Sequence, residues 1–108
     1  MKNKRKDDRI GVSFPIECNK LTSKSYFYTV SKDLSESGVK ILTDNFIPRG
    51  DCLKLNINLI DRIVELKAKV AWCNPEKTAT RFAVGLQFIE INDQNRNAIN
   101  HFLSKVYN

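Results

Sequence analysis

The stretch Leu-Lys-Leu-Asn-Ile-Asn-Leu at residues 53–59, followed by Val-Glu-Leu-Lys-Ala-Lys-Val-Ala-Trp at residues 64–72, determines the fold class. Apolar and polar residues alternate along both runs, which is the pattern of a β-strand with one buried face. Asp61 and Arg62 predict a turn between the runs, so the two strands form an antiparallel hairpin. Trp72 falls on the apolar face, where we expect it to anchor the core; a stacking platform for a ligand is the alternative.

Four more strand-like runs occupy the rest of the chain. Residues 12–18 alternate, with Pro15 predicting an edge strand or a bulge, and residues 26–30 are aromatic and β-branched. Residues 39–43 and 82–88 complete the set. Short antiparallel strands that each have one apolar face are best closed as a small barrel or a sandwich, because closure removes exposed sheet edges.

The C-terminal segment changes from a period of two to helical spacing. The apolar residues that follow this spacing are Ala98, Ile99, Phe102, Leu103 and Val106. Asn92 is a suitable N-cap and Asp93 is well placed against the helix dipole, so we predict a helix over residues 93–106. Its apolar stripe must be covered, and we expect it to pack on the strands in preference to a partner chain.

Length and charge limit the classes of protein that fit. The 108 residues suffice for one domain, which we divide into a basic arm at residues 1–10, expected to be mobile, and a folded domain at residues 11–108. A net charge of +6 favours anionic partners such as nucleotides, nucleic acid or an acidic membrane surface. No apolar run approaches the roughly 20 residues of a membrane span, so we expect no span and a cytoplasmic location.

Catalysis has little support in the sequence. His101 is the single histidine and falls off the helical stripe, so we expect an exposed side chain without a role. Cys18, Cys52 and Cys73 are spaced too widely for a metal or redox motif and predict semi-buried thiols in a reducing compartment. There is no phosphate-binding glycine loop and no nucleophile motif. We therefore expect no enzymatic activity, no metal and no cofactor.

Two short motifs could form a binding site. Arg5 and Arg9 are four residues apart in the basic arm, and arginine can grip guanine, clamp a phosphate or stack on a base; a solvated tail is the alternative. Asp33, Ser35 and Gly38 lie in the turn between two strand-like runs. Asp33 can accept hydrogen bonds from a guanine, Ser35 can bind ligand oxygens and Gly38 can leave room for a ligand. Alternatively, all three only shape the turn, with Gly38 supplying a positive φ.

The order of these motifs resembles the PilZ domain family. An Arg-x-x-x-Arg arm precedes a small β-barrel, and Asp-x-Ser-x-x-Gly follows between two strands. The run Val-Gly-Leu-Gln-Phe at residues 84–88 and the helix over residues 93–106 are also similar to the family, so the resemblance covers essentially the whole chain. It implies an all-β fold, a six-stranded antiparallel β-barrel with a C-terminal α-helix.

The resemblance also implies a bacterial cyclic di-GMP receptor that binds its ligand and does not turn it over. In that case Arg5 and Arg9 grip guanine and phosphate from the arm, and Asp33, Ser35 and Gly38 line the barrel side of the site. Lys4 precedes the arginine motif, where a cation supports the phosphates of a second, intercalated ligand molecule.

We expect the arm to fold onto the barrel around the ligand, and a monomer or weak dimer to signal through an unidentified effector protein. The rivals are a barrel that binds single-stranded nucleic acid, which the mixed charges of the strands disfavour, and a ligand-independent protein adaptor.

Overall fold

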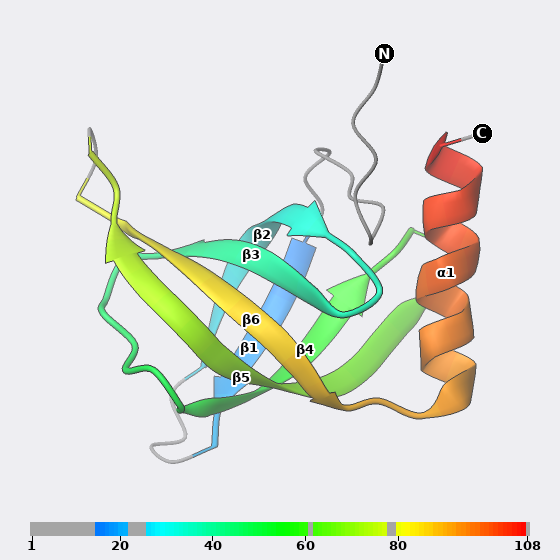
Figure 1. Ribbon diagram of the computed structural model, residues 1–108, viewed down its shortest axis with the longest axis horizontal. Helices are drawn as coiled ribbons and strands as arrows, with labels where there is room; N and C mark the ends of the chain where they lie inside the picture. The colour runs from blue at the N-terminus through cyan, green and yellow to red at the C-terminus, as the bar shows by residue number, and fades with distance from the viewer. Residues whose placement is uncertain (1–14, 22–25, 61, 78–79, 108) are drawn as a thin grey trace.

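The computed structural model describes residues 15–21, 26–60, 62–77 and 80–107. Six strands close into an antiparallel barrel in the order β1-β2-β3-β6-β5-β4, and a helix stands beside it (Figure 1). The elements are β1 Pro15–Lys20, β2 Tyr26–Leu34, β3 Gly38–Thr43, β4 Cys52–Asn58, β5 Ile63–Pro75, β6 Phe82–Glu90 and α1 Asp93–Tyr107. This confirms the predicted six-stranded barrel with a C-terminal α-helix. The predicted arm at residues 1–10 lies outside the described residues.

The barrel closes between β1 and β4. Ile16 of β1 faces Thr29 of β2 on one side and Ile57 of β4 on the other. β1 is therefore not an edge strand, and the expectation drawn from Pro15 was wrong. Pro15 is tolerated because it is the first residue of the strand, where a missing ladder hydrogen bond matters least.

The hairpin of β4 and β5 provides much of the core, as its alternation predicts. The apolar side chains of both strands are buried at Leu53, Leu55, Ile57, Val64, Leu66, Ala68 and Val70. The turn is closed by a hydrogen bond of 2.8 Å from the amide of Leu59 to the carbonyl oxygen of Arg62. Burial of these aliphatic side chains is the main stabilising contribution to a barrel of this size.

Trp72 departs from this alternation. It is 40% exposed and lies on the outer wall, so the expectation of a core anchor was wrong. The β5–β6 register shifts between Val70 and Trp72, where a β-bulge adds a residue to β5. An extra residue moves every later side chain to the opposite face of the sheet. The bulge thus places the indole outside the barrel.

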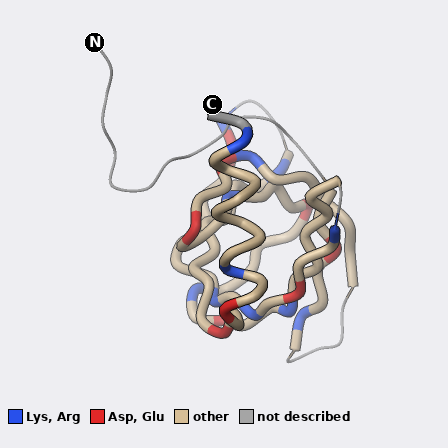
Figure 2. Tube along the Cα trace, turned by 90° about the vertical axis from the view of Figure 1, so that its right-hand side faces the viewer, with Lys and Arg blue, Asp and Glu red and all other residues tan. Residues whose placement is uncertain are grey.

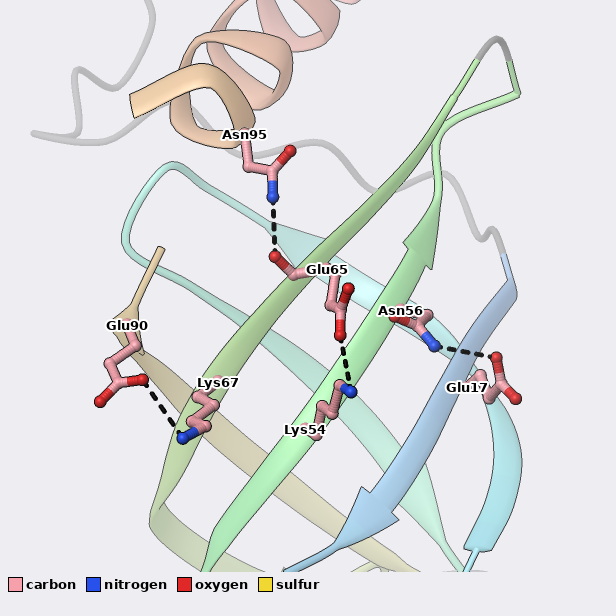
Figure 3. Close-up of polar contacts among 7 residues, drawn as sticks. All are labelled: Glu17, Lys54, Asn56, Glu65, Lys67, Glu90 and Asn95. Atoms are coloured by element: carbon pink, nitrogen blue, oxygen red, sulfur yellow. Dashed lines mark hydrogen bonds and ion pairs between the residues drawn. The ribbon is translucent and has the colours of Figure 1, made fainter. Parts of the chain in front are cut away.

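The helix packs on the barrel as predicted. Ile99 and Leu103 are buried in the common core. Asn92 caps the helix by accepting a hydrogen bond of 2.7 Å from the amide of Asn95. The side-chain amide of Asn95 in turn donates to the backbone oxygen of Glu65 on β5, at 2.8 Å (Figure 3). In the described part of the chain, no helix is long and apolar enough to cross a membrane.

Candidate functional site

The Asp33–Gly38 segment forms the connection between β2 and β3. Asp33 was expected in the turn, but β2 continues to Leu34 and Asp33 lies within the strand, opposite Lys40 of β3. The register between β2 and β3 shifts at a bulge between Ser31 and Asp33, and the two strands remain paired beyond it. β2 therefore continues past the aromatic run. The turn itself is reduced to residues 35–37.

Ser35 fixes the shape of this turn from inside. Its side chain is fully buried, and its amide donates to the carbonyl oxygen of Gly38 at 2.9 Å. Its hydroxyl oxygen accepts hydrogen bonds from the amides of Ser37 and Gly38, both at 3.2 Å. Such side-chain to backbone bonds stabilise a tight turn in place of ladder hydrogen bonds. The structure therefore contains the hydrogen bonds expected if Ser35 shapes the turn, which was the alternative interpretation of this residue.

Gly38 is required by close packing. A Cβ at this position would collide with the carbonyl oxygen of Leu86 on the neighbouring strand β6. The alternative in which Gly38 supplies a positive φ was wrong, since among the described glycines the positive φ belongs to Gly50. Gly38 thus lets β3 and β6 approach each other directly behind the turn.

Asp33 and Lys40 form a partly exposed ion pair across the two strands of the hairpin. The Lys40 Nζ lies 3.8 Å from a carboxylate oxygen of Asp33, and the two side chains are 35% and 39% exposed. This pair contributes little to stability, because partly exposed ion pairs are screened by solvent. Both groups remain accessible to a ligand. The sequence analysis did not predict that Lys40 pairs with Asp33. Asp33 and Lys40 are equally far along the sequence from the centre of the turn, and this spacing could have indicated the pair.

The structure thus brings Asp33, Ser35 and Gly38 together in one hairpin. Lys4, Arg5 and Arg9 lie outside the described residues, so the second half of the predicted site stays a prediction.

A second polar cluster lies on the outer faces of β1, β2 and β4. The hydroxyl of Tyr26 bonds to the carboxylate of Glu17, which also accepts a hydrogen bond of 3.1 Å from Asn56 (Figure 3). These bonds lower the pKa of Glu17, and the carboxylate raises the pKa of Tyr26. Tyr28 packs edge-to-face against Tyr26. The two tyrosines are exposed, and Glu17 and Asn56 are partly exposed.

The remaining candidates show no catalytic arrangement. His101 is exposed, as expected. Within the described ranges, no three His, Cys, Asp or Glu residues come together as metal ligands. Along the described trace, positions of Lys and Arg are interspersed with positions of Asp and Glu (Figure 2). This distribution is unlike the continuous positive groove of proteins that bind single-stranded nucleic acid.

Comparison with known proteins identifies the family. The PilZ domain family matches residues 3–105 of the chain. The structure is similar to Bacillus subtilis MotI/DgrA, an inhibitor of motility, at a TM-score of 0.83 and 18% identity over 98% of this chain and 52% of that one. The PilZ domain of Escherichia coli YcgR with c-di-GMP has a TM-score of 0.78 and 15% identity over 97% of this chain and 92% of that one.

K. pneumonia MrkH in complex with c-di-GMP has a TM-score of 0.77 and 13% identity over 98% of this chain and 52% of that one. The chain therefore spans about half the length of MotI/DgrA and of MrkH. No curated protein matches the sequence significantly. The family match covers nearly the whole chain and agrees with the barrel and the helix. The chain belongs to the PilZ domain family, a family of ligand-binding domains and not of enzymes.

Proposed function

We propose that this protein is a receptor for cyclic di-GMP. The observation that carries the proposal is the Asp33–Gly38 hairpin, in which the carboxylate of Asp33 is partly exposed, in a sequence that also contains Arg5-x-x-x-Arg9. Two structures similar to this one, YcgR and MrkH, contain c-di-GMP. The net charge of +6 suits a ligand with two phosphates.

Each residue of the hairpin has a distinct role in this proposal. The carboxylate of Asp33 accepts hydrogen bonds from the N–H groups of a guanine Watson–Crick edge. Ser35 is buried and acts by fixing the turn, and Gly38 acts by bringing the turn against β6. Arg5 and Arg9 supply guanidinium groups for a phosphate and a guanine face, and Lys4 supplies a cation when a second ligand molecule binds.

Signalling follows from the same arrangement. Binding draws residues 1–10 onto the barrel, and a separate effector protein recognises the surface that results. Hydrogen exchange with and without cyclic di-GMP tests this step, with increased protection of residues 1–10 as the expected result. Equal exchange in both states contradicts the proposed change while leaving ligand binding itself intact.

The receptor function is tested by fluorescence anisotropy with labelled cyclic di-GMP. Unlabelled cyclic di-GMP should compete and GTP should not. Asp33→Ala should weaken binding about tenfold or more, since it removes a charged acceptor. Asp44→Ala is the matched control, because Asp44 is an exposed carboxylate in the loop after β3.

Affinity that grows with the length of a single-stranded oligonucleotide, in the absence of cyclic di-GMP binding, would replace this proposal with the nucleic-acid function. No binding of either ligand would favour the protein adaptor.

A further inference from the structure

A cleft of about 570 Å³ lies between α1 and the turn that joins β4 to β5. Leu59, Ile60 and Arg62 line it on the side of the turn. On the helix side, the lining residues recur every three or four positions from Gln94 to Lys105, so they share one face of α1. This face runs for about 16 Å, or about three helical turns.

Ile60 places apolar surface at the edge of this cleft. Its side chain is 86% exposed, the largest exposed fraction among the large apolar side chains of the described residues. Its φ of 76° is also unfavourable for a β-branched residue. Strained backbone conformations concentrate at functional sites, where the surrounding structure maintains them. The turn thus holds an isoleucine in water in a conformation that disfavours it.

The apolar surface continues from Ile60 onto the helix. Ala98 and Phe102 line the opposite wall of the cleft and are only half-buried. An apolar surface that extends over several residues and is bordered by polar side chains is typical of a protein interaction site. The cleft is therefore suited to a partner with apolar side chains of its own.

The charge of the cleft indicates what else the partner carries. Arg62 and Lys105 line the cleft and are exposed, whereas no Asp or Glu is among the described lining residues. Neither cation forms an ion pair within the described ranges. Asp61, between Ile60 and Arg62, lies outside those ranges. Unpaired cations at the rim of an apolar cleft favour a partner with carboxylates in matching positions.

The same charges disfavour two other occupants. Residues 1–10 contain five Lys or Arg and two Asp, so the basic arm of this chain is repelled by the cations of the cleft. A second copy of the chain brings a net charge of +6 to the same cleft. An acidic segment of a different protein is the occupant that the charges favour.

We propose that this cleft binds an amphipathic helix of a partner protein, in which Asp and Glu border an apolar stripe. A helix of about three turns matches the length of the lined face of α1. Its apolar side chains pack on Ile60, Ala98 and Phe102, and its carboxylates pair with Arg62 and Lys105. No residue of the Asp33–Gly38 hairpin lines the cleft. The inference goes beyond the receptor function and requires no cyclic di-GMP.

The test is an NMR titration of the isotope-labelled protein with two synthetic peptides of about 14 residues. Both have Leu at helical spacing, with Glu on the polar face of one peptide and Lys on that of the other. The acidic peptide should shift the signals of Ile60, Ala98 and Phe102 and bind with a dissociation constant of about 100 μM or below. The basic peptide should bind at least about tenfold more weakly. No binding of the acidic peptide, or shifts outside the cleft only, would overturn the inference.

Charge reversal tests the two cations. The double variant Arg62→Glu, Lys105→Glu should bind the basic peptide more tightly than the acidic one. Lys69→Glu is the matched control, because Lys69 is exposed on β5 outside the cleft. It should keep the preference for the acidic peptide. An unchanged preference in the double variant would show that Arg62 and Lys105 do not select the partner.

The contribution of Ile60 is tested by Ile60→Asn. This variant should bind the acidic peptide at least about tenfold more weakly without a lower melting temperature, because asparagine tolerates the backbone conformation. Ile89→Asn is the control, since Ile89 is an exposed apolar residue of β6 outside the cleft. It should change the affinity by no more than about twofold. Equal effects of the two substitutions would contradict the assigned role of Ile60.

Two further outcomes would assign the cleft to another occupant and overturn the inference. One is a shift of the signals of residues 1–10 in Ile60→Asn without peptide, which would show that the arm occupies the cleft. The other is a dimer in sedimentation that dissociates in Ile60→Asn, which would show a second copy there. Failure of the protein to bind cyclic di-GMP would overturn the receptor function and leave this inference standing.

Discussion

The indole of Trp72 fills the space in which a side chain at Gly85 would stand. The two residues face each other across β5 and β6, directly after the bulge in β5. The bulge turns the indole outward, and the absence of a side chain at Gly85 leaves the space that the ring occupies. The relationship leads to a prediction that does not depend on any ligand.

Gly85→Ala should displace the indole towards solvent. The methyl group and the ring cannot occupy the same space, so we expect a red shift of Trp72 emission and a decrease of about 1–3 kcal/mol in the free energy of unfolding. Urea denaturation monitored by circular dichroism measures the second quantity. Gln87→Ala, an exposed position two residues along the same strand, should leave both unchanged. An unshifted emission spectrum in Gly85→Ala would show that the contact is not as described.

Gly38→Ala should destabilise the barrel as well as any ligand site. The new methyl group meets a backbone oxygen, that of Leu86, which cannot move without shifting β6. We expect a loss of about 1–3 kcal/mol in the free energy of unfolding without ligand, measured in the same denaturation assay. Loss of cyclic di-GMP binding in Gly38→Ala is therefore poor evidence for a ligand contact. Unchanged stability would contradict the close approach of β3 and β6.

Ile60→Asn should stabilise the protein. Ile60 is 86% exposed and has a φ of 76°, a conformation that is strained for a β-branched residue and well tolerated by asparagine. We expect the free energy of unfolding to increase by about 1 kcal/mol. Ile63→Asn is the control, because Ile63 is also exposed but begins the strand β5. An equal effect of both substitutions would mean that backbone strain at Ile60 is not the cause.

Cys18 should make the protein less stable at high pH. Burial, with a smaller contribution from the charge of Glu17, raises the pKa of the thiol from 9.0 to about 12. Below pH 9 the thiol is protonated in both states, so its contribution to stability is fully present. As the pH rises from 9 towards 12, the unfolded chain loses this proton and the folded chain keeps it, so stability falls.

The loss attributable to Cys18 should reach about 1 kcal/mol between pH 9 and pH 10. Denaturation of the unmodified protein and of Cys18→Ala at both values isolates this contribution from that of other titrating groups. Parallel pH dependence in the two proteins would mean that Cys18 ionises normally in the fold. Cys18 should also resist alkylation under native conditions, whereas Cys52 and Cys73 are only partly buried.

Most of the fold could be predicted because the apolar alternation is regular. The runs at residues 53–59 and 64–70 and the stripe of Ile99 and Leu103 each match the observed burial. Two of the failures fall at the two bulges. One extends β2 through Asp33 and the other moves Trp72 outward, and a bulge adds a residue without changing the composition of a strand.

The site could be predicted only in part, for a related reason. Asp33, Ser35 and Gly38 are close in the sequence, so their spacing alone suggests one turn. Asp33 lies opposite Lys40 of β3, and this pairing depends on a strand register with a bulge that the alternation does not reveal. The contact that requires Gly38 also lies across strands, with Leu86.

The most direct test of the account is calorimetric titration of cyclic di-GMP into the unmodified protein and into Arg5→Ala and Arg9→Ala. The account predicts saturable binding by the unmodified protein, a loss of about tenfold or more in affinity for each arginine variant, and little change in the controls Lys2→Ala and Lys6→Ala. Because the heat of binding can be near zero at one temperature, the titration is repeated at a second temperature. Absence of binding at both temperatures, or equal affinity in the arginine and lysine variants, would contradict it.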